Sequence, residues 1–117
     1  MRLERDHHHS RKGWYFGPWD SDLGISLGYA NEGIDEPHFH QRMSEVYMVA
    51  RGTAEIRVEH ETVELTQGDV IVIEPGEAHT FLSSSSDYFH FVMQLPALQG
   101  DEASADKVPV PESRFGL

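Results

Sequence analysis

The chain has 117 residues, with 20 acidic and 9 basic side chains, a formal net charge of -11 and no cysteine. Its length suits a single domain with its own core, and its negative charge disfavours nucleic acid and anionic membrane surfaces as partners. The lack of cysteine excludes disulfides and thiolate sites, and no apolar run reaches the roughly 20 residues that span a bilayer, so we expect a soluble, cytoplasmic protein.

Residues 1–22 are predicted to form an amino-terminal arm. The arm contains His7, His8 and His9, a run that resembles a fragment of an affinity tag or a flexible segment more than a binding site. Around the turn at Gly17 and Pro18 it also carries four aromatic residues, namely Trp14, Tyr15, Phe16 and Trp19. Such side chains are costly to leave in water, and the edges of an open sheet need a cover. We therefore expect the arm and the strand edges to build a homodimer.

Residues 23–96 contain short runs rich in Val, Ile, Phe and Tyr, separated by Gly, Pro, Asn or Ser. In residues 23–29 and 53–60 the side chains alternate in character with a period of two, which is typical of strands. The run 70–73 is apolar throughout, which predicts a strand buried on both faces. Many short strands with frequent turns indicate an all-β sandwich or barrel. Residues 97–117, rich in Asp, Glu, Ser, Ala and Pro, are predicted to form an extended tail.

Two histidines one residue apart, His38 and His40, precede a glutamate at the head of a strand, Glu45. In a strand, residues i and i+2 share a face about 6 to 7 Å apart, so both imidazoles can point to one place. His79 follows the turn at residues 74–78 and adds a third imidazole from a different strand. Three nitrogens and one carboxylate oxygen suit one divalent transition metal, namely Mn, Fe, Co, Ni, Cu or Zn. The alternative is that these side chains are solvated at a strand edge.

An inward face of such a barrel forms a pocket beside the metal. Alternation predicts a mostly apolar wall built by Tyr47, Val49, Ile56, Phe81, Phe89, Phe91 and Met93. Tyr47 follows Glu45 on the same face and is the candidate proton donor or orienting hydrogen-bond donor; the alternative is a plain aromatic wall residue. His90 and Gln94 alternate with the apolar residues of the last strand and are predicted to point outward. His60 is predicted to be exposed in a hairpin.

The same segments resemble the two motifs of the cupin superfamily. Residues 33–52, GIDEPHFHQRMSEVYMVARG, are similar to the first motif, G-x5-H-x-H-x3,4-E-x6-G, with four residues instead of five between Gly33 and His38. Residues 68–79, GDVIVIEPGEAH, are similar to the second, G-x5-P-x-G-x2-H-x3-N, with Glu74 in place of the proline and Ser83 in place of the asparagine. The resemblance implies a small single-domain cupin, a double-stranded β-helix or jelly roll at residues 23–96. It also implies a metal inside the barrel, with the ligands His38, His40, Glu45 and His79.

A metal in an apolar pocket favours a small-molecule ligand that binds the metal through its own oxygens, such as an enol, a diketone or a hydroxy acid. We therefore expect a metal-dependent, dioxygenase-like enzyme. The second hypothesis is a sugar or sugar-phosphate isomerase or epimerase, which needs cations at the pocket mouth to hold phosphate. It ranks second because the middle of the chain offers few basic residues, namely Arg42, Arg51 and Arg57. A non-catalytic module that binds a small ligand or a metal is the third, favoured by the shortage of acid–base groups on the predicted inner face.

Overall fold

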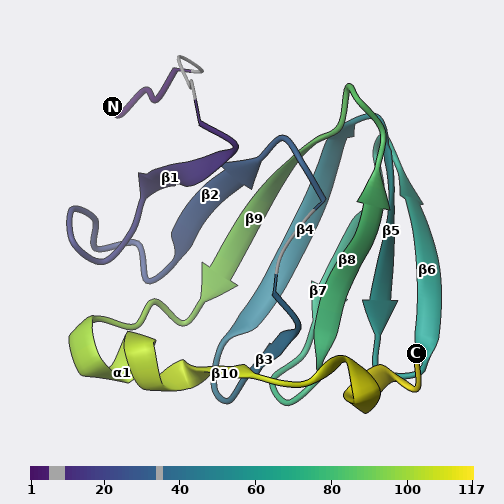
Figure 1. The fold of residues 1–117 in the computed structure, drawn as a ribbon. Helices are drawn as coiled ribbons and strands as arrows, with labels where there is room; N and C mark the ends of the chain where they lie inside the picture. Colours follow the sequence, from purple (N-terminus) through teal and green to yellow (C-terminus); the bar gives the residue numbers. More distant parts are fainter. Residues whose placement is uncertain (6–9, 34–35) are drawn as a thin grey trace.

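The computed structural model describes residues 1–5, 10–33 and 36–117, so His7, His8 and His9 lie outside the described residues. Within these ranges the chain forms two five-stranded sheets that face each other in a sandwich (Figure 1). Neighbouring strands are antiparallel throughout, which confirms the all-β class predicted from the sequence.

The first sheet has the strand order β1-β2-β9-β4-β7. Its strands are β1 (Lys12–Phe16), β2 (Ser26–Ala30), β9 (Phe89–Leu95), β4 (Ser44–Arg51) and β7 (Val70–Ile73). The second sheet has the order β10-β3-β8-β5-β6. Its strands are β10 (Lys107–Pro109), β3 (His38–His40), β8 (His79–Ser84), β5 (Thr53–Val58) and β6 (Glu61–Thr66). Two short helices follow β9, namely α1 (Gly100–Asp106) and the 3-10 helix η1 (Glu112–Phe115).

The core lies between the sheets and is built by the inward side chains of both. In β4, Glu45, Tyr47 and Val49 are buried and the residues between them are partly exposed, which confirms the face predicted from alternation. The buried apolar cluster consists of Tyr47, Val49, Ala54, Ile56, Leu65, Ile73, Phe81 and Tyr88. Because this cluster fills only part of the space between the sheets, the remainder is open for a pocket.

Strand β7 differs from the prediction. It lies at the edge of the first sheet, where Val70 and Val72 are 62% and 49% exposed, whereas Ile73 is buried. The expectation that residues 70–73 are buried on both faces is wrong, because one face of this sheet meets the core and the other faces solvent. An apolar run does not distinguish an exposed edge strand from a central one.

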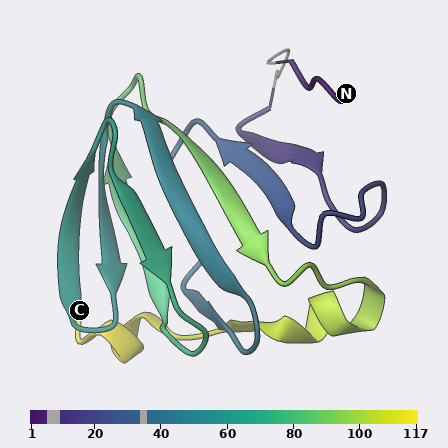
Figure 2. The same ribbon diagram turned by 180° about the vertical axis from the view of Figure 1, so that it is seen from behind.

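Both terminal segments pair with the sheets. Lys12 in β1 lies opposite Ala30 in β2, and Lys107 in β10 lies opposite His40 in β3. The carboxyl-terminal segment, α1, β10 and η1, runs along the lower end of the strands in both views (Figures 1 and 2). Residues 97–117 are therefore not the extended tail expected from their composition. No helix within the described residues is long and apolar enough to cross a membrane.

Candidate metal centre

Four side chains from three strands converge between the sheets. His38 and His40 project from the same face of β3, because they are two residues apart. His79 in β8 lies directly opposite His38 in the register of the two strands. Glu45 comes from β4 in the other sheet. All four are buried, with at most 4% of each residue exposed. The folded chain thus brings the predicted ligand set together.

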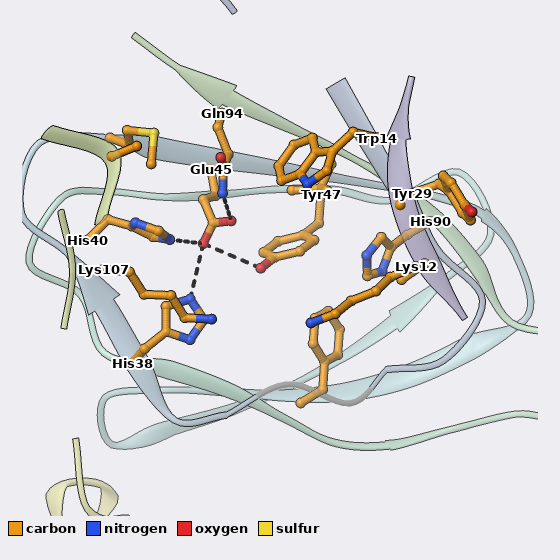
Figure 3. Close-up of a pocket in the computed structure, with 16 residues that line it drawn as sticks. Lys12, Trp14, Tyr29, His38, His40, Glu45, Tyr47, His90, Gln94 and Lys107 are labelled. Atoms are coloured by element: carbon orange, nitrogen blue, oxygen red, sulfur yellow. Dashed lines mark hydrogen bonds and ion pairs between the residues drawn. The ribbon is translucent and has the colours of Figure 1, made fainter. Parts of the chain in front are cut away.

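The histidine Nε2 atoms meet at one oxygen of Glu45. They lie 2.9 Å (His79), 3.1 Å (His40) and 3.6 Å (His38) from Glu45 Oε1. The ligand atoms of His38, Glu45 and His79 are within 4.8 Å of one another. Figure 3 shows His38 and His40 pointing toward the Glu45 carboxylate. Donors that share a metal at about 2.1 Å and near right angles are about 3 Å apart. His38, Glu45 and His79 therefore fit donors of a single metal ion, and His40 Nε2 lies near the same Glu45 oxygen.

The second nitrogen of each ring faces an acceptor. The three Nδ1 atoms donate to Glu36 O (2.6 Å, from His38), Glu77 O (3.1 Å, from His79) and Asp106 Oδ2 (2.9 Å, from His40). A carbonyl or carboxylate oxygen can only accept, so Nδ1 carries a hydrogen, and Nε2 is the ring nitrogen that faces Glu45. Such outer partners fix the tautomer and the orientation of metal-binding histidines.

Asp106 is a site residue that the sequence did not reveal. It ends α1, its side chain is completely buried, and its Oδ1 accepts a hydrogen bond from the Arg42 amide at 2.7 Å. One carboxylate thus connects the carboxyl-terminal segment to His40 and to the loop after β3. In the sequence nothing distinguishes Asp106 from its acidic neighbours Asp101 and Glu102.

Glu45 keeps a negative charge among these rings. Burial raises the pKa of its carboxyl, but hydrogen bonds with His38, His40 and His79 outweigh that effect and hold the pKa well below its usual range. Because the Nδ1 hydrogens are engaged elsewhere, each Nε2 can face the carboxylate favourably only with a proton or a cation between them. A carboxylate and three imidazoles are also the donor types that divalent transition metals prefer. The residues present therefore fit the predicted metal.

Residues 28–94 match the cupin domain family. The chain belongs to the cupin family. The matched range contains both sequence motifs and confirms the resemblance on which the fold was predicted. No curated protein sequence matches the chain.

Solved structures share the fold of this cupin. Pac13 from Streptomyces with uridine is 19% identical, with a TM-score of 0.66 over 79% of this chain and 72% of that chain. KdgF from Halomonas sp. is 18% identical, with a TM-score of 0.64 over 87% of this chain and 93% of that chain. A protein from Planctomyces limnophilus is 21% identical, with a TM-score of 0.63 over 82% and 77%. At these identities the likeness concerns the fold, and it confirms the predicted double-stranded β-helix.

The candidate metal donors of this cupin border a pocket of about 470 Å³. Tyr47 lines it, with its hydroxyl 3.4 Å from Glu45 Oε1. Gln94 lines it too and donates to Glu45 Oε2 at 3.1 Å. His90 lines it from the same face of β9, and its Nδ1 is 2.6 Å from the Tyr88 hydroxyl.

The prediction that His90 and Gln94 point outward is wrong. In the register of β4 and β9, His90 lies opposite Val49 and Gln94 lies opposite Glu45. Directly opposed residues share a face of the sheet, and the β4 side chains point inward. The two polar residues follow them into the interior, so that His90 is 4% exposed. The register between β4 and β9, if it had been known from the sequence, would have placed His90 and Gln94 on the inner face.

The predicted pocket wall needs a matching correction. Tyr47 and Phe81 line the pocket as predicted. The predicted residues that do not line it are Val49, Ile56, Phe89, Phe91 and Met93. The first two belong to the buried core cluster. The two phenylalanines project from the opposite face of β9, where their rings lie 5.9 Å from those of Tyr29 and Tyr15.

Two further pocket residues come from the terminal segments. Lys12 of β1 and Lys107 of β10 both line the pocket. The sequence suggested basic residues in the middle of the chain, but Arg57, for example, donates to Thr62 Oγ1 and to Phe115 O instead. His60 is exposed, as predicted.

Proposed function

We propose that this cupin is a metal-dependent enzyme that acts on a small oxygen-rich molecule by transferring a proton. The proposal is carried by one observation: a convergent donor set borders a pocket that also contains an imidazole and a phenol, those of His90 and Tyr47. The residues that would hold one divalent transition metal are His38, His40, Glu45 and His79. When bound, such a cation polarises a substrate oxygen as a Lewis acid, which makes a hydrogen on the adjacent carbon more acidic.

His90 is the candidate base or acid. Its ring is buried, and its Nδ1 is 2.6 Å from the Tyr88 hydroxyl. Burial raises the pKa of Tyr88, so this phenol stays neutral and can either donate or accept a hydrogen bond. The Tyr88 hydroxyl can therefore pair with His90 Nδ1 whether or not that nitrogen carries a hydrogen. His90 can therefore take up a proton and return it.

Tyr47 is the candidate proton donor or orienting residue. Its hydroxyl lies 3.4 Å from Glu45 Oε1 and its ring packs edge-on against His90, with 5.0 Å between the ring centroids. A phenol in this place lies between the donor set and the imidazole. The Tyr47 hydroxyl can orient a substrate oxygen near Glu45, or donate a proton to that oxygen.

The polar lining changes the order of the candidate reactions. The mostly apolar wall predicted from the sequence favours a dioxygenase-like reaction. The lining in fact includes Lys12, His90, Gln94 and Lys107, and these groups favour proton transfer, as in an isomerase or a lyase. The lysines also supply the cations that a sugar-phosphate isomerase needs, whose scarcity in the middle of the chain placed that hypothesis second. The dioxygenase-like reaction is the alternative, and oxygen consumption with each substrate distinguishes it.

Metal content tests the first half of the proposal. We expect elemental analysis of the protein purified without added metal to find one divalent transition metal per chain. The double variant His38→Ala, His79→Ala should lose it, while His60→Ala, which changes an exposed histidine, should retain it. Unchanged metal content in the double variant would refute the site.

Turnover tests the second half. A panel of hydroxy acids, keto acids, sugars and sugar phosphates should contain a substrate that is isomerised or dehydrated without oxygen uptake. With that substrate, Tyr47→Phe should lower the rate by about 10² to 10⁴ if the hydroxyl donates a proton, and leave the metal content intact. A rate within about threefold of the parent would make Tyr47 a wall residue. No turnover with any compound would favour the non-catalytic module.

A further inference from the structure

The chain contains two lysines, Lys12 and Lys107, one in each terminal segment, and both line the same pocket. Figure 3 shows their side chains reaching into the pocket from different sides. Seven other basic residues are arginines, and none of these lines the pocket. Both lysines therefore line the pocket that the candidate metal donors border.

The strand registers explain why both ammonium groups enter the pocket. Lys12 lies opposite Ala30, which lies opposite His90 in the next strand, so Lys12 shares the inner face of the first sheet with His90. Lys107 lies opposite His40 and shares the inner face of the second sheet. β1 and β10 are the edge strands of their sheets. Each sheet thus carries one lysine on the strand that borders the pocket.

The pocket is positive although the molecule is strongly acidic. The lining residues include two lysines and one carboxylate, that of Glu45, so their formal charge is +1 in a chain of charge -11. A divalent cation among the histidines would add to this charge. A concave site of this sign attracts anions and concentrates them.

We propose that Lys12 and Lys107 bind the anionic group of a small organic acid, a carboxylate or a phosphate monoester, which is the substrate of this cupin. A pocket of about 470 Å³ holds a molecule of metabolite size. Lysine binds both anions as a point charge with three donors. The identification of this acid as the substrate rests on the proposed function, whereas the binding of its anionic group does not.

Binding of matched pairs of compounds tests the proposal. The full-length protein, both as purified and after treatment with a chelator, is titrated with lactate and its neutral analogue lactamide, and with glycerol 3-phosphate and glycerol. Trp14 lines the pocket and supplies a fluorescence signal, which calorimetry checks. We expect each anion to bind at least about tenfold more tightly than its neutral analogue. The tighter of the two anions then identifies the class of acid.

Lysine variants locate the effect. Lys12→Met and Lys107→Met should each weaken binding of the preferred anion about tenfold. Arg11→Met is the matched control, because it removes the same charge from the neighbouring residue, whose side chain is 75% exposed and paired with Glu32. It should change the affinity less than twofold. Circular dichroism establishes that all variants are folded.

Two results would overturn the proposal. One is equal binding of lactate and lactamide together with equal binding of glycerol 3-phosphate and glycerol. The other is a loss in Arg11→Met as large as in the lysine variants, which would mean that only the charge of the whole molecule matters. Because the chelator-treated protein is included, a failure to bind metal would contradict the proposed function and leave this test standing.

Discussion

Asp106 holds the His40 ring on the side opposite to Glu45, with its Oδ2 2.9 Å from His40 Nδ1. Its other oxygen is engaged by the Arg42 amide, so the carboxylate has little freedom to turn. Partners of this kind typically change metal affinity by 10-fold to 100-fold when they are altered. We expect Asp106→Asn, which preserves the shape and removes the charge, to weaken Zn²⁺ binding by about this factor in competition with a chelating dye.

A matched control separates this role from a general effect of charge. Asp101→Asn removes the same charge from an exposed position in the first turn of α1 and should leave Zn²⁺ affinity within twofold. Thermal unfolding of the metal-free proteins reports any loss of fold. Equal Zn²⁺ affinity of Asp106→Asn and the parent would show that the contact with His40 does not influence the metal.

Single residues of the site differ in how far the sequence predicts them. His38, His40, Glu45 and His79 could be proposed as ligands because each stands at a fixed distance from a strand start or a turn. Lys12, Lys107 and Asp106 could not. They reach the site through the pairing of the terminal segments with β2 and β3, and no local pattern of residues specifies which distant strand an edge strand joins.

Glu59 joins three elements at the turn between β5 and β6. Its Oε1 accepts hydrogen bonds from the Ala78 amide at 2.7 Å and from Arg114 Nη2 at 3.0 Å, and so connects this turn to the start of β8 and to η1. Partial burial raises the pKa of the Glu59 carboxyl, but the Ala78 amide and the Arg114 guanidinium outweigh it and hold the pKa below its ordinary value of 4.5. The ionised form is therefore favoured by folding.

The pH dependence follows from this shift. A carboxyl whose pKa is lower in the folded state than in the unfolded state stabilises the folded protein. This contribution is complete above the pKa of the unfolded state and is lost as the pH falls through the pKa of the folded state. We expect Glu59→Gln to reduce the free energy of unfolding at pH 7 by about 0.5 to 1 kcal/mol, discounted because a third of the side chain is exposed. Urea unfolding should show the difference shrinking below pH 4.5. A difference that stays constant into acid would contradict the ionic contact.

Strands β4 and β9 show why some elements are easier to predict than others. In β4 the residues on both faces are apolar, since Val46 and Met48 lie between the buried Glu45, Tyr47 and Val49, and the inner face follows from the position of Glu45 in the motif. In β9 the larger apolar side chains, Phe89 and Phe91, lie on the outer face beside the aromatic residues Tyr15 and Tyr29 of the same sheet, and His90 lies inside. Hydrophobicity alone selects the wrong face wherever aromatic side chains cluster on the outside of a sheet and the inside carries a polar site.

For the molecule as a whole, the homodimer expected from the sequence stays a prediction. β1 is an edge strand, and Trp14 and Trp19 are 48% and 59% exposed with their ring centroids 6.0 Å apart. Exposed rings at a strand edge are costly in water. We expect light scattering at micromolar concentration to give twice the mass of the chain, and Trp19→Ser to give the mass of one chain.

The other edge of the same sheet provides the comparison. Val72 in β7 is 49% exposed, so Val72→Lys disturbs an apolar edge far along the strand order from β1. This variant should remain dimeric if the aromatic segment forms the contact. A monomer for the unchanged chain, or dissociation by Val72→Lys alone, would contradict the predicted interface.

The docking of α1 also makes the opening of the site measurable by hydrogen exchange. The amides of Gln41 and Arg42 donate to the backbone oxygen and to the carboxylate of Asp106, at 3.0 and 2.7 Å. These two amides can exchange with deuterium only when their hydrogen bonds to Asp106 open. We expect an opening in which α1 moves away to withdraw the carboxylate from His40 and to displace Lys107, the residue next to Asp106 in the chain. At high pH, where every opening leads to exchange, their exchange rate equals the opening rate of the pocket on this side. That opening rate sets an upper limit on how fast a trapped ligand escapes by that route.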